Sequence, residues 1–264
     1  MSNGPSAGRR LPIYSGFPAA FPVPDRPAST EISLSVVSDS LQACPYLDNE
    51  VARMPLLLPD RELEPPHLDR LLDRGYRRCG RYFYRTMCPS CQECVPVRVD
   101  VSRFRERPSM KRILNRAERE LSIEYGKVTG GEERLALFNR HRSERELGDQ
   151  AASEEDLRSF LLESNVETIE LRIQNAGRLV CVAIADLGRE SINAVYTYFD
   201  SREKRFSLGT LAVLELIRFA RQTQRRFVYL GLFVADCRHL NYKARFWPQE
   251  RRLNGEWLRF DTAD

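Results

Sequence analysis

The chain has 264 residues, 42% of them hydrophobic and 30% charged, which is enough to bury one large core or two modest ones. No run approaches the roughly 18 to 20 apolar residues of a membrane span. Prolines at positions 12, 18, 22, 24 and 27 interrupt the apolar start, which argues against a signal peptide. Seven cysteines in such a chain favour reduced thiols or metal ligands over disulfides. We therefore expect a cytoplasmic monomer that does not bind a membrane.

The net charge of +4 is unevenly distributed. Six arginines oppose one aspartate in residues 70–85, and eight lysines or arginines oppose three acidic residues in residues 98–119, so each segment carries a net charge of +5. Tyrosines and a phenylalanine lie among the first set of arginines and could stack nucleic-acid bases. This clustering favours a polyanionic partner, with a solvated basic surface as the alternative.

The first 31 residues hold six of the fifteen prolines and are predicted to be a disordered tail. After them, hydrophobic patterning and a helix stop at Gly75 predict a strand at 32–37, a helix at 66–74, and strands at 81–85 and 95–101. These elements surround most of the cysteines. We therefore predict a small cysteine-rich N-terminal domain over residues 32–104.

Three cysteines between the two last strands have the spacing Cys88-x2-Cys91-x2-Cys94. Thiolates at this spacing converge readily on one zinc ion or iron-sulfur cluster, and Cys44 is a candidate fourth ligand. Buried or redox-active thiols are the alternative. The other three cysteines are interpreted as ordinary small apolar residues, and Cys181 in particular lies within the apolar run LVCVAIA.

The second half of the chain alternates helices and strands. The predicted elements are a basic helix at 108–120, helices at 132–145 and 153–163, strands at 168–174, 179–187 and 192–199, a helix after residue 210, and a strand at 227–230. On the first of these helices, Lys111, Arg112 and Arg116 are candidate contacts to nucleic-acid phosphates. This order predicts an α+β fold over residues 105–264, with the mixed sheet of an N-acetyltransferase-like domain.

A glycine-containing turn, Ser207-Leu-Gly-Thr210, precedes the longest apolar helix. The free N–H groups at such a helix N-terminus attract phosphate or a developing oxyanion, so Ser207, Gly209 and Thr210 are candidate substrate contacts. A plain structural turn is the alternative. Three residues separate Arg205 from Gly209 and no second glycine follows, which does not fit the pyrophosphate loop of acetyl-CoA enzymes. We expect no acetyl-CoA.

Several motifs, in the same order along the chain, resemble the N-end-rule aminoacyl-tRNA-protein transferase family, which comprises the arginyltransferases and their bacterial leucyltransferase relatives. The resemblance covers roughly residues 40–250. The motifs that carry it are Cys44-Pro-Tyr-Leu47, GYRRCGRYFY at 75–84, CPSCQECVPVRV at 88–99, Ser109-Met-Lys-Arg112, Ser207-Leu-Gly-Thr210, Tyr229-Leu-Gly231 and CRHLNYKARF at 237–246.

The resemblance implies transfer of an amino acid from its tRNA to the α-amine of a protein that begins with Asp or Glu, which marks that protein for degradation. We expect arginine as the transferred residue, with leucine as the alternative. The resemblance also implies an iron-sulfur cluster, for which Cys44, Cys91 and Cys94 are the nearest matches and Cys88 is a further candidate. A non-catalytic protein that binds tRNA or senses redox state is the competing interpretation.

Aminolysis of an activated ester needs orientation of the amine and removal of one proton, and no covalent enzyme intermediate. Asp236, Asp200 or the tRNA ribose hydroxyl are the candidate proton acceptors, while Asn241 and Tyr242 are candidate hydrogen-bond donors. His239 is interpreted as structural. An acidic first residue needs a cation. The candidates are Arg77, Arg78, Arg81, Lys243 and Arg245.

Overall fold

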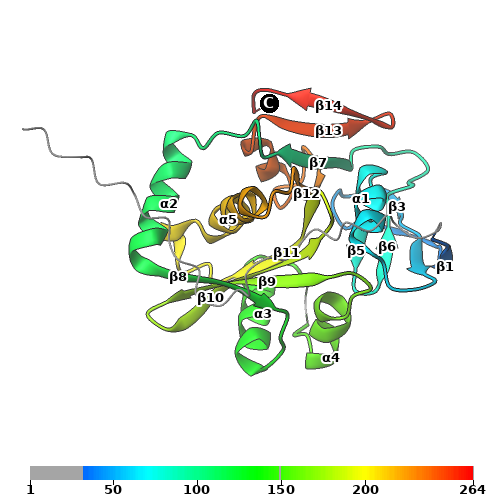
Figure 1. Ribbon diagram of the computed structural model, residues 1–264. Coiled ribbons are helices and arrows are strands. Elements are labelled where there is room, and N and C mark those ends of the chain that lie inside the picture. Colours follow the sequence, from blue (N-terminus) through cyan, green and yellow to red (C-terminus); the bar gives the residue numbers. More distant parts are fainter. Residues whose placement is uncertain (1–31, 149, 264) are drawn as a thin grey trace, which may run out of the picture.

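The computed structural model describes residues 32–148 and 150–263, so the predicted tail, residues 1–31, lies outside the described part. Its largest element is a mixed sheet of eight strands (Figure 1). In spatial order these are β14 (Glu256–Phe260), β13 (Gln249–Leu253), β7 (Val95–Asp100), β12 (Phe227–Phe233), β11 (Ser191–Phe199), β10 (Arg178–Leu187), β9 (Thr168–Asn175) and β8 (Leu121–Lys127). The predicted α+β class is confirmed.

Helices cover both faces of this sheet (Figure 1). One face carries α2 (Pro108–Glu120) and α5 (Leu208–Gln222). The opposite face carries α3 (Glu132–Glu144) and α4 (Glu154–Leu157), which continues into a π-helical turn, η1 (Arg158–Leu162). No helix within the described ranges is long and apolar enough to cross a membrane.

Strand β10 is apolar from residue 179 to residue 185 because both of its faces are covered there. Cys181 and Ala183 point into the core beneath α2 and α5, while Val182 and Ile184 pack against α3 and α4. Cys181 is therefore a buried core residue, as predicted. This alternation explains why the sequence pattern alone shows a continuous apolar run rather than a two-residue period.

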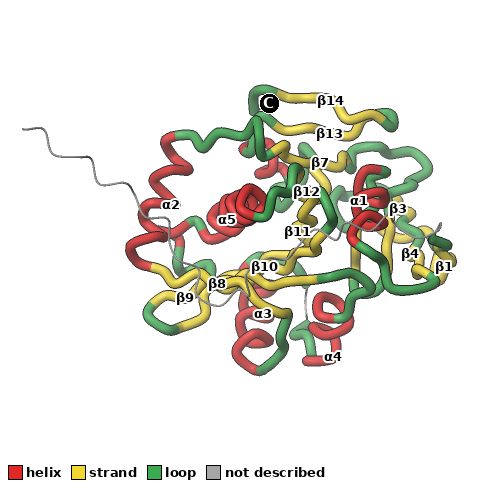
Figure 2. The backbone as a smooth tube through the Cα atoms, in the orientation of Figure 1, coloured by secondary structure: helices red, strands yellow, loops and turns green. Residues whose placement is uncertain are grey.

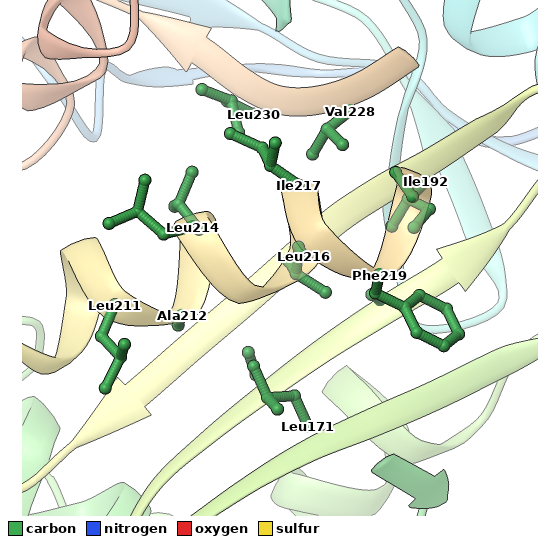
Figure 3. Close-up of a cluster of buried hydrophobic side chains, with 14 of the residues drawn as sticks. Leu171, Ile192, Leu211, Ala212, Leu214, Leu216, Ile217, Phe219, Val228 and Leu230 are labelled. Carbon is green, nitrogen blue, oxygen red and sulfur yellow. The ribbon is translucent and has the colours of Figure 1, made fainter. Parts of the chain in front are cut away.

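Helix α5 crosses the sheet with its apolar side on β9, β11 and β12 (Figure 3). Leu211, Leu216 and Ile217 are fully buried there. Each such side chain contributes about 1.5–3 kcal/mol relative to an exposed one. The helix is the crossover between the only parallel pair among the assigned strands of the described chain, β11 and β12. This strand, glycine turn, helix and strand are arranged as the N-acetyltransferase-like prediction requires.

A smaller sheet lies beside the large one (Figure 2). It has four strands, β1 (Leu34–Ser38), β4 (Leu56–Pro59), β6 (Tyr82–Tyr84) and β5 (Arg77–Cys79), next to α1 (Pro65–Asp73) and a hairpin of β2 (Leu41–Ala43) and β3 (Val51–Arg53). The predicted boundary at residue 104 does not fit the topology, because β7 pairs with both β12 and β13 inside the large sheet. Residues 32–104 therefore do not form a unit separate from that sheet.

Candidate active site

Strands β11 and β12 pair only over residues 191–193 and 227–229. Beyond that point the two strands no longer pair with each other. We call this region, residues 194–199 of β11 and residues 230–233 of β12, the β11–β12 split. The pairing of β12 with its other neighbour, β7, shifts register between Tyr229 and Gly231, and Gly231 has a φ of +89°. The separation leaves room for side chains from other elements to enter between the two strands.

Arg77 of β5 lies where the strands part. Its guanidinium donates to the Asn193 side chain at 2.6 Å and to the Ala194 carbonyl at 3.1 Å. A Cβ at Gly231 would lie 2.9 Å from an Arg77 nitrogen, so the approach of this side chain, together with the positive φ, requires glycine. Sequence reasoning selected Arg77, and the structure places it at the split.

Lys243 enters the split from the other side, on the 3-10 helix η3 (Asn241–Arg245). It is buried, and its Nζ donates to the Leu232 carbonyl at 2.6 Å. Burial, and then the charge of Arg77, lower its pKa to about 7. Near neutral pH a fraction of Lys243 is therefore an uncharged amine with a lone pair available.

Arg145 follows the last residue of α3 and reaches the split from the α3 face. One of its terminal nitrogens lies 3.3 Å from Nδ1 of His239, and its guanidinium carbon lies 5.9 Å from the centre of the Phe199 ring. Nothing in its sequence neighbourhood marks it, because a cation at the C-terminal end of a helix is common. Sequence analysis missed this residue.

His141, one turn earlier on α3, holds the end of β11 in place. Its Nδ1 lies 3.2 Å from the Phe199 backbone nitrogen, from which it can accept, and 3.1 Å from the Phe199 carbonyl oxygen. Its ring packs edge-on to the Phe199 ring with centres 4.6 Å apart. Burial lowers its pKa to about 4, so it is neutral at pH 7. Its role is to position Phe199. Gly209 of α5 packs closely on that ring, because a Cβ at residue 209 would lie only 3.1 Å from it.

The N-terminus of α5 lies beside Phe199. Ser207 has a left-handed φ of 51° and does not cap the helix with its side chain.

Helix α2 lies near this turn, because Arg116 donates to the Arg205 carbonyl. Lys111, Arg112 and Arg116 are all exposed. At the other end of α2, Arg107 stacks on Trp247 and contacts the Arg245 carbonyl. The exposed basic residues thus lie on a surface that borders both α5 and η3.

Comparison with known proteins identifies the family. The family models described as "Arginine-tRNA-protein transferase, N terminus" and "C terminus" match residues 42–112 and 133–253. The chain belongs to this family. An "Aspartate/glutamate leucyltransferase" of Methylobacillus flagellatus is 32% identical over 83% of this chain and 89% of its own. A protein of the same name from Saccharophagus degradans is 34% identical over 86% of this chain and 97% of its own.

The chain is accordingly an aminoacyltransferase. Among solved structures, FemX is similar at 9% identity, with a TM-score of 0.46 over 76% of this chain and 69% of its own.

For this transferase, the predicted proton acceptors differ in their surroundings. Asp200 is fully buried and paired with three arginines, at 3.3 Å for Arg140 and 2.7 Å for both Arg178 and Arg202. The hydrogen bonds from Arg202 and Arg178 outweigh burial and hold its pKa well below the usual range. Asp200 is therefore a poor base, and its ion pairs hold the turn after β11 in place. Asp236 is exposed in the segment that follows β12.

The two predicted hydrogen-bond donors belong to η3. The Asn241 amide donates to the Ala235 carbonyl at 3.2 Å, which closes the turn before η3. Tyr242 is half-buried, and burial raises the pKa of its hydroxyl while Arg145 and then Arg77 oppose that shift. Phe246 is fully buried in the core, in agreement with the core-packing alternative.

The other three predicted substrate-binding cations have different surroundings from Arg77 and Lys243. Arg78 forms a fully buried ion pair with Asp186 at 2.9 Å and cannot reach a substrate in this arrangement. Arg81 is exposed and donates to the Asn165 side chain at 3.3 Å. Arg245 is exposed on the surface bordered by α2. Sequence could not separate Arg78 from Arg77, because only the topology decides which of these neighbouring β5 residues enters the split.

The cysteines converge partly. Burial, followed by repulsion from the nearby thiols of Cys44, Cys88, Cys91 and Cys237, raises the pKa of Cys94 to about 12. The other three predicted ligands are thus near Cys94, but no group of three metal-binding side chains in the described ranges is arranged closely enough to hold an ion. The donor set, all sulfur, fits zinc or an iron-sulfur cluster.

Proposed function

We propose that this transferase moves leucine from leucyl-tRNA to the α-amine of proteins that begin with Asp or Glu. The observation that carries the proposal is the shared name of its relatives, which are 32% and 34% identical over most of both chains. Arginine, which the sequence favoured, finds no support among these relatives, so leucine replaces it. The non-catalytic alternative is set aside because the chain belongs to an enzyme family.

The chemistry requires little from the protein beyond positioning and charge. The α-amine nitrogen attacks the ester carbonyl carbon, the bond to the ribose oxygen breaks, and the proton lost by the amine ends on that oxygen. The N-terminus of α5 and the cations at the split can stabilise the negative oxygen of the intermediate. Correct orientation of the amine supplies much of the remaining acceleration.

Lys243 is the better-placed proton acceptor. A pKa of about 7 lets the neutral amine accept a proton from the α-amine, whose pKa in a free peptide is about 7.7 to 8.0. Asp200 is already bound by three arginines. Asp236 and the ribose hydroxyl remain as alternatives, with Asn241 and Tyr242 orienting the substrate.

The exposed basic residues of α2 are proposed to bind the tRNA backbone. Lys111, Arg112 and Arg116 carry the charge, and their helix borders both the N-terminus of α5 and η3. A tRNA lying along α2 would therefore bring its 3′ end to the side of the split covered by α5. Ser207, Gly209 and Thr210 would contact its terminal phosphate or the ester.

We also propose that Cys44, Cys88, Cys91 and Cys94 hold zinc or an iron-sulfur cluster as a structural group. The nearness of the other three thiols to Cys94, together with their all-sulfur chemistry, supports it. Anaerobically purified protein should contain zinc, or iron and sulfide, and the double variant Cys91→Ser/Cys94→Ser should lose it and unfold at a lower temperature. Metal-free wild-type protein with the same melting temperature and activity would refute this site.

The transfer itself is tested with leucyl-tRNA and arginyl-tRNA, each labelled in the amino acid. The acceptors are peptides that differ only in a first residue of Asp, Glu, Asn or Lys. We expect label from leucyl-tRNA on the Asp and Glu peptides. A peptide with an acetylated α-amine is the control, since it cannot attack the ester. If neither tRNA supports transfer, the proposal is overturned.

A further inference from the structure

Arg145 is surrounded by side chains from both sides of the β11–β12 split. Tyr196 belongs to β11, and Tyr242 belongs to η3, beyond β12. Burial raises the pKa of both hydroxyls. The charges of Arg142 and then Arg145 oppose the shift at Tyr196, and those of Arg145 and then Arg77 oppose it at Tyr242, so Arg145 is the guanidinium that lies near both. His239 supplies its one hydrogen-bond contact, at 3.3 Å. The side chain therefore spans the split on the α3 face of the sheet.

No carboxylate in the described part of the chain lies within ion-pair distance of Arg145. Its two acidic neighbours in sequence are engaged elsewhere, Glu144 with the Ser201 hydroxyl and Glu146 with Arg238. Arg140, on the same helix, does have a carboxylate partner, Asp200. A guanidinium carries five N–H donors, so Arg145 retains most of its hydrogen-bonding capacity.

Two other cations at the split are already committed. Arg77 donates from both terminal nitrogens to Asn193 and Ala194, and Lys243 donates to the Leu232 carbonyl. Arg142 also lies near Tyr196, but its guanidinium stacks on the Phe138 ring at 5.6 Å. Arg145, which lies near side chains from both sides of the split, is thus the cation best placed to take a carboxylate in two-pronged geometry. It also lies on the face opposite α2 and α5, where we place the tRNA.

We propose that Arg145 binds the side-chain carboxylate of the acceptor's first residue, and so determines the specificity of the transferase for Asp and Glu. The inference rests on the proposed function and names the residue that recognises the acceptor. In this arrangement the donor approaches from the face covered by α2 and α5, and the acceptor from the α3 face. His239 contacts only one Arg145 nitrogen, which leaves the other N–H groups available to the ligand.

A purely structural role makes a different prediction. A cation at the C-terminus of α3 stabilises the helix dipole, and its loss would lower stability by a few tenths to about 1 kcal/mol. Such a loss would affect every acceptor peptide equally. Recognition of a carboxylate predicts a loss that depends on the charge of the first residue.

The test measures kcat/KM with saturating leucyl-tRNA for peptides that begin with Asp, Glu, Asn or Gln and are otherwise identical. In Arg145→Ala we expect kcat/KM for the Asp and Glu peptides to fall about 10- to 100-fold, while the values for the Asn and Gln peptides change little. Arg145→Lys should fall between these values, because it keeps the charge and loses the planar pair of donors. The KM for leucyl-tRNA should not change in either variant.

Arg158→Ala is the matched control. It removes an exposed arginine on the same face of the sheet, one that already has carboxylate partners, and it should leave all four peptides unaffected. An equal loss for charged and amide peptides, or no loss in Arg145→Ala, would overturn the inference even if Asp and Glu peptides remain substrates of the wild type. If Arg145→Ala does not fold, the comparison of the four peptides is made with Arg145→Lys. Wild-type protein that transfers to none of them would instead refute the proposed function.

Discussion

Two neighbouring arginines of β5 meet the large sheet in opposite electrostatic settings. Arg78 forms a fully buried ion pair with Asp186, which also accepts from Asn193 and Thr168. Arg77, the preceding residue, enters the split and meets only the neutral oxygens of Asn193 and Ala194. Charge compensated in full holds the two sheets together. Charge left without a carboxylate gives the split a positive potential, which can stabilise the negative oxygen of the transfer intermediate.

The largest expected effect comes from removing the carboxylate that neutralises Arg78. Asp186→Ala leaves the Arg78 guanidinium buried without a counter-charge, and should lower the free energy of unfolding by about 3–5 kcal/mol. Denaturant titration measures the change. Asp39→Ala removes the partner of an exposed arginine, Arg53, and should leave the transition midpoint nearly unchanged. Equal destabilisation by both variants would contradict the distinction between the two kinds of pair.

Acid should weaken the attachment of α3 at the end of β11. The pKa of His141 is about 4 in the folded protein, against an ordinary value of 6.5 for an exposed histidine, so the unfolded chain takes up the proton first. The stability due to neutral His141 is complete above pH 6.5 and is lost as the pH falls towards 4. The loss is about 3 kcal/mol from this residue. His141→Asn keeps an acceptor for the Phe199 N–H and does not titrate.

Unfolding free energies of wild type and His141→Asn at pH 7 and pH 4.5 test this expectation. The wild type should lose more stability than the variant over that interval. A parallel decline of the two proteins would assign the acid sensitivity to other groups.

The cations at the split, which lack a carboxylate partner in the described part of the chain, are tested through Lys243 and the pH dependence of catalysis. Below pH 7 both Lys243 and the α-amine must lose a proton, so log(kcat/KM) should rise with pH at a slope approaching about 2. Lys243→Met retains the buried volume and leaves only the amine to titrate, which gives a slope of about 1 and a rate about 100-fold lower at pH 8. An unchanged slope in the variant would exclude Lys243 as the proton acceptor and leave Asp236 or the ribose hydroxyl.

Local patterns in the sequence predicted most elements of this fold and only part of the site. The basic helix at 108–120 and the strand at 168–174 agree with α2 and β9, because their apolar periodicity is set by the faces that they bury. The helix at 153–163 was predicted as one element, but it changes to π-helical hydrogen bonding at Arg158.

Long-range pairing was not predictable in the same way. The insertion of β7 between β12 and β13 joins residues about 130 to 150 positions apart, and no local pattern encodes it. The surroundings of Arg78 and Arg145 were not predictable for the same reason. The first meets Asp186 and the second meets His239 only through the folded topology.

The smallest expected effect concerns the exposed charges of α2. The triple variant Lys111→Gln/Arg112→Gln/Arg116→Gln should weaken tRNA binding and reduce the slope of log affinity against log salt by about one unit for each phosphate that the variant no longer binds. A control that removes three exposed arginines elsewhere, Arg53, Arg158 and Arg259, makes the same change in net charge. If both triple variants reduce the slope equally, tRNA responds to the overall charge of the protein. A reduction confined to the α2 variant would place the phosphates on the face that carries α5, opposite Arg145, and would support separate approaches for donor and acceptor.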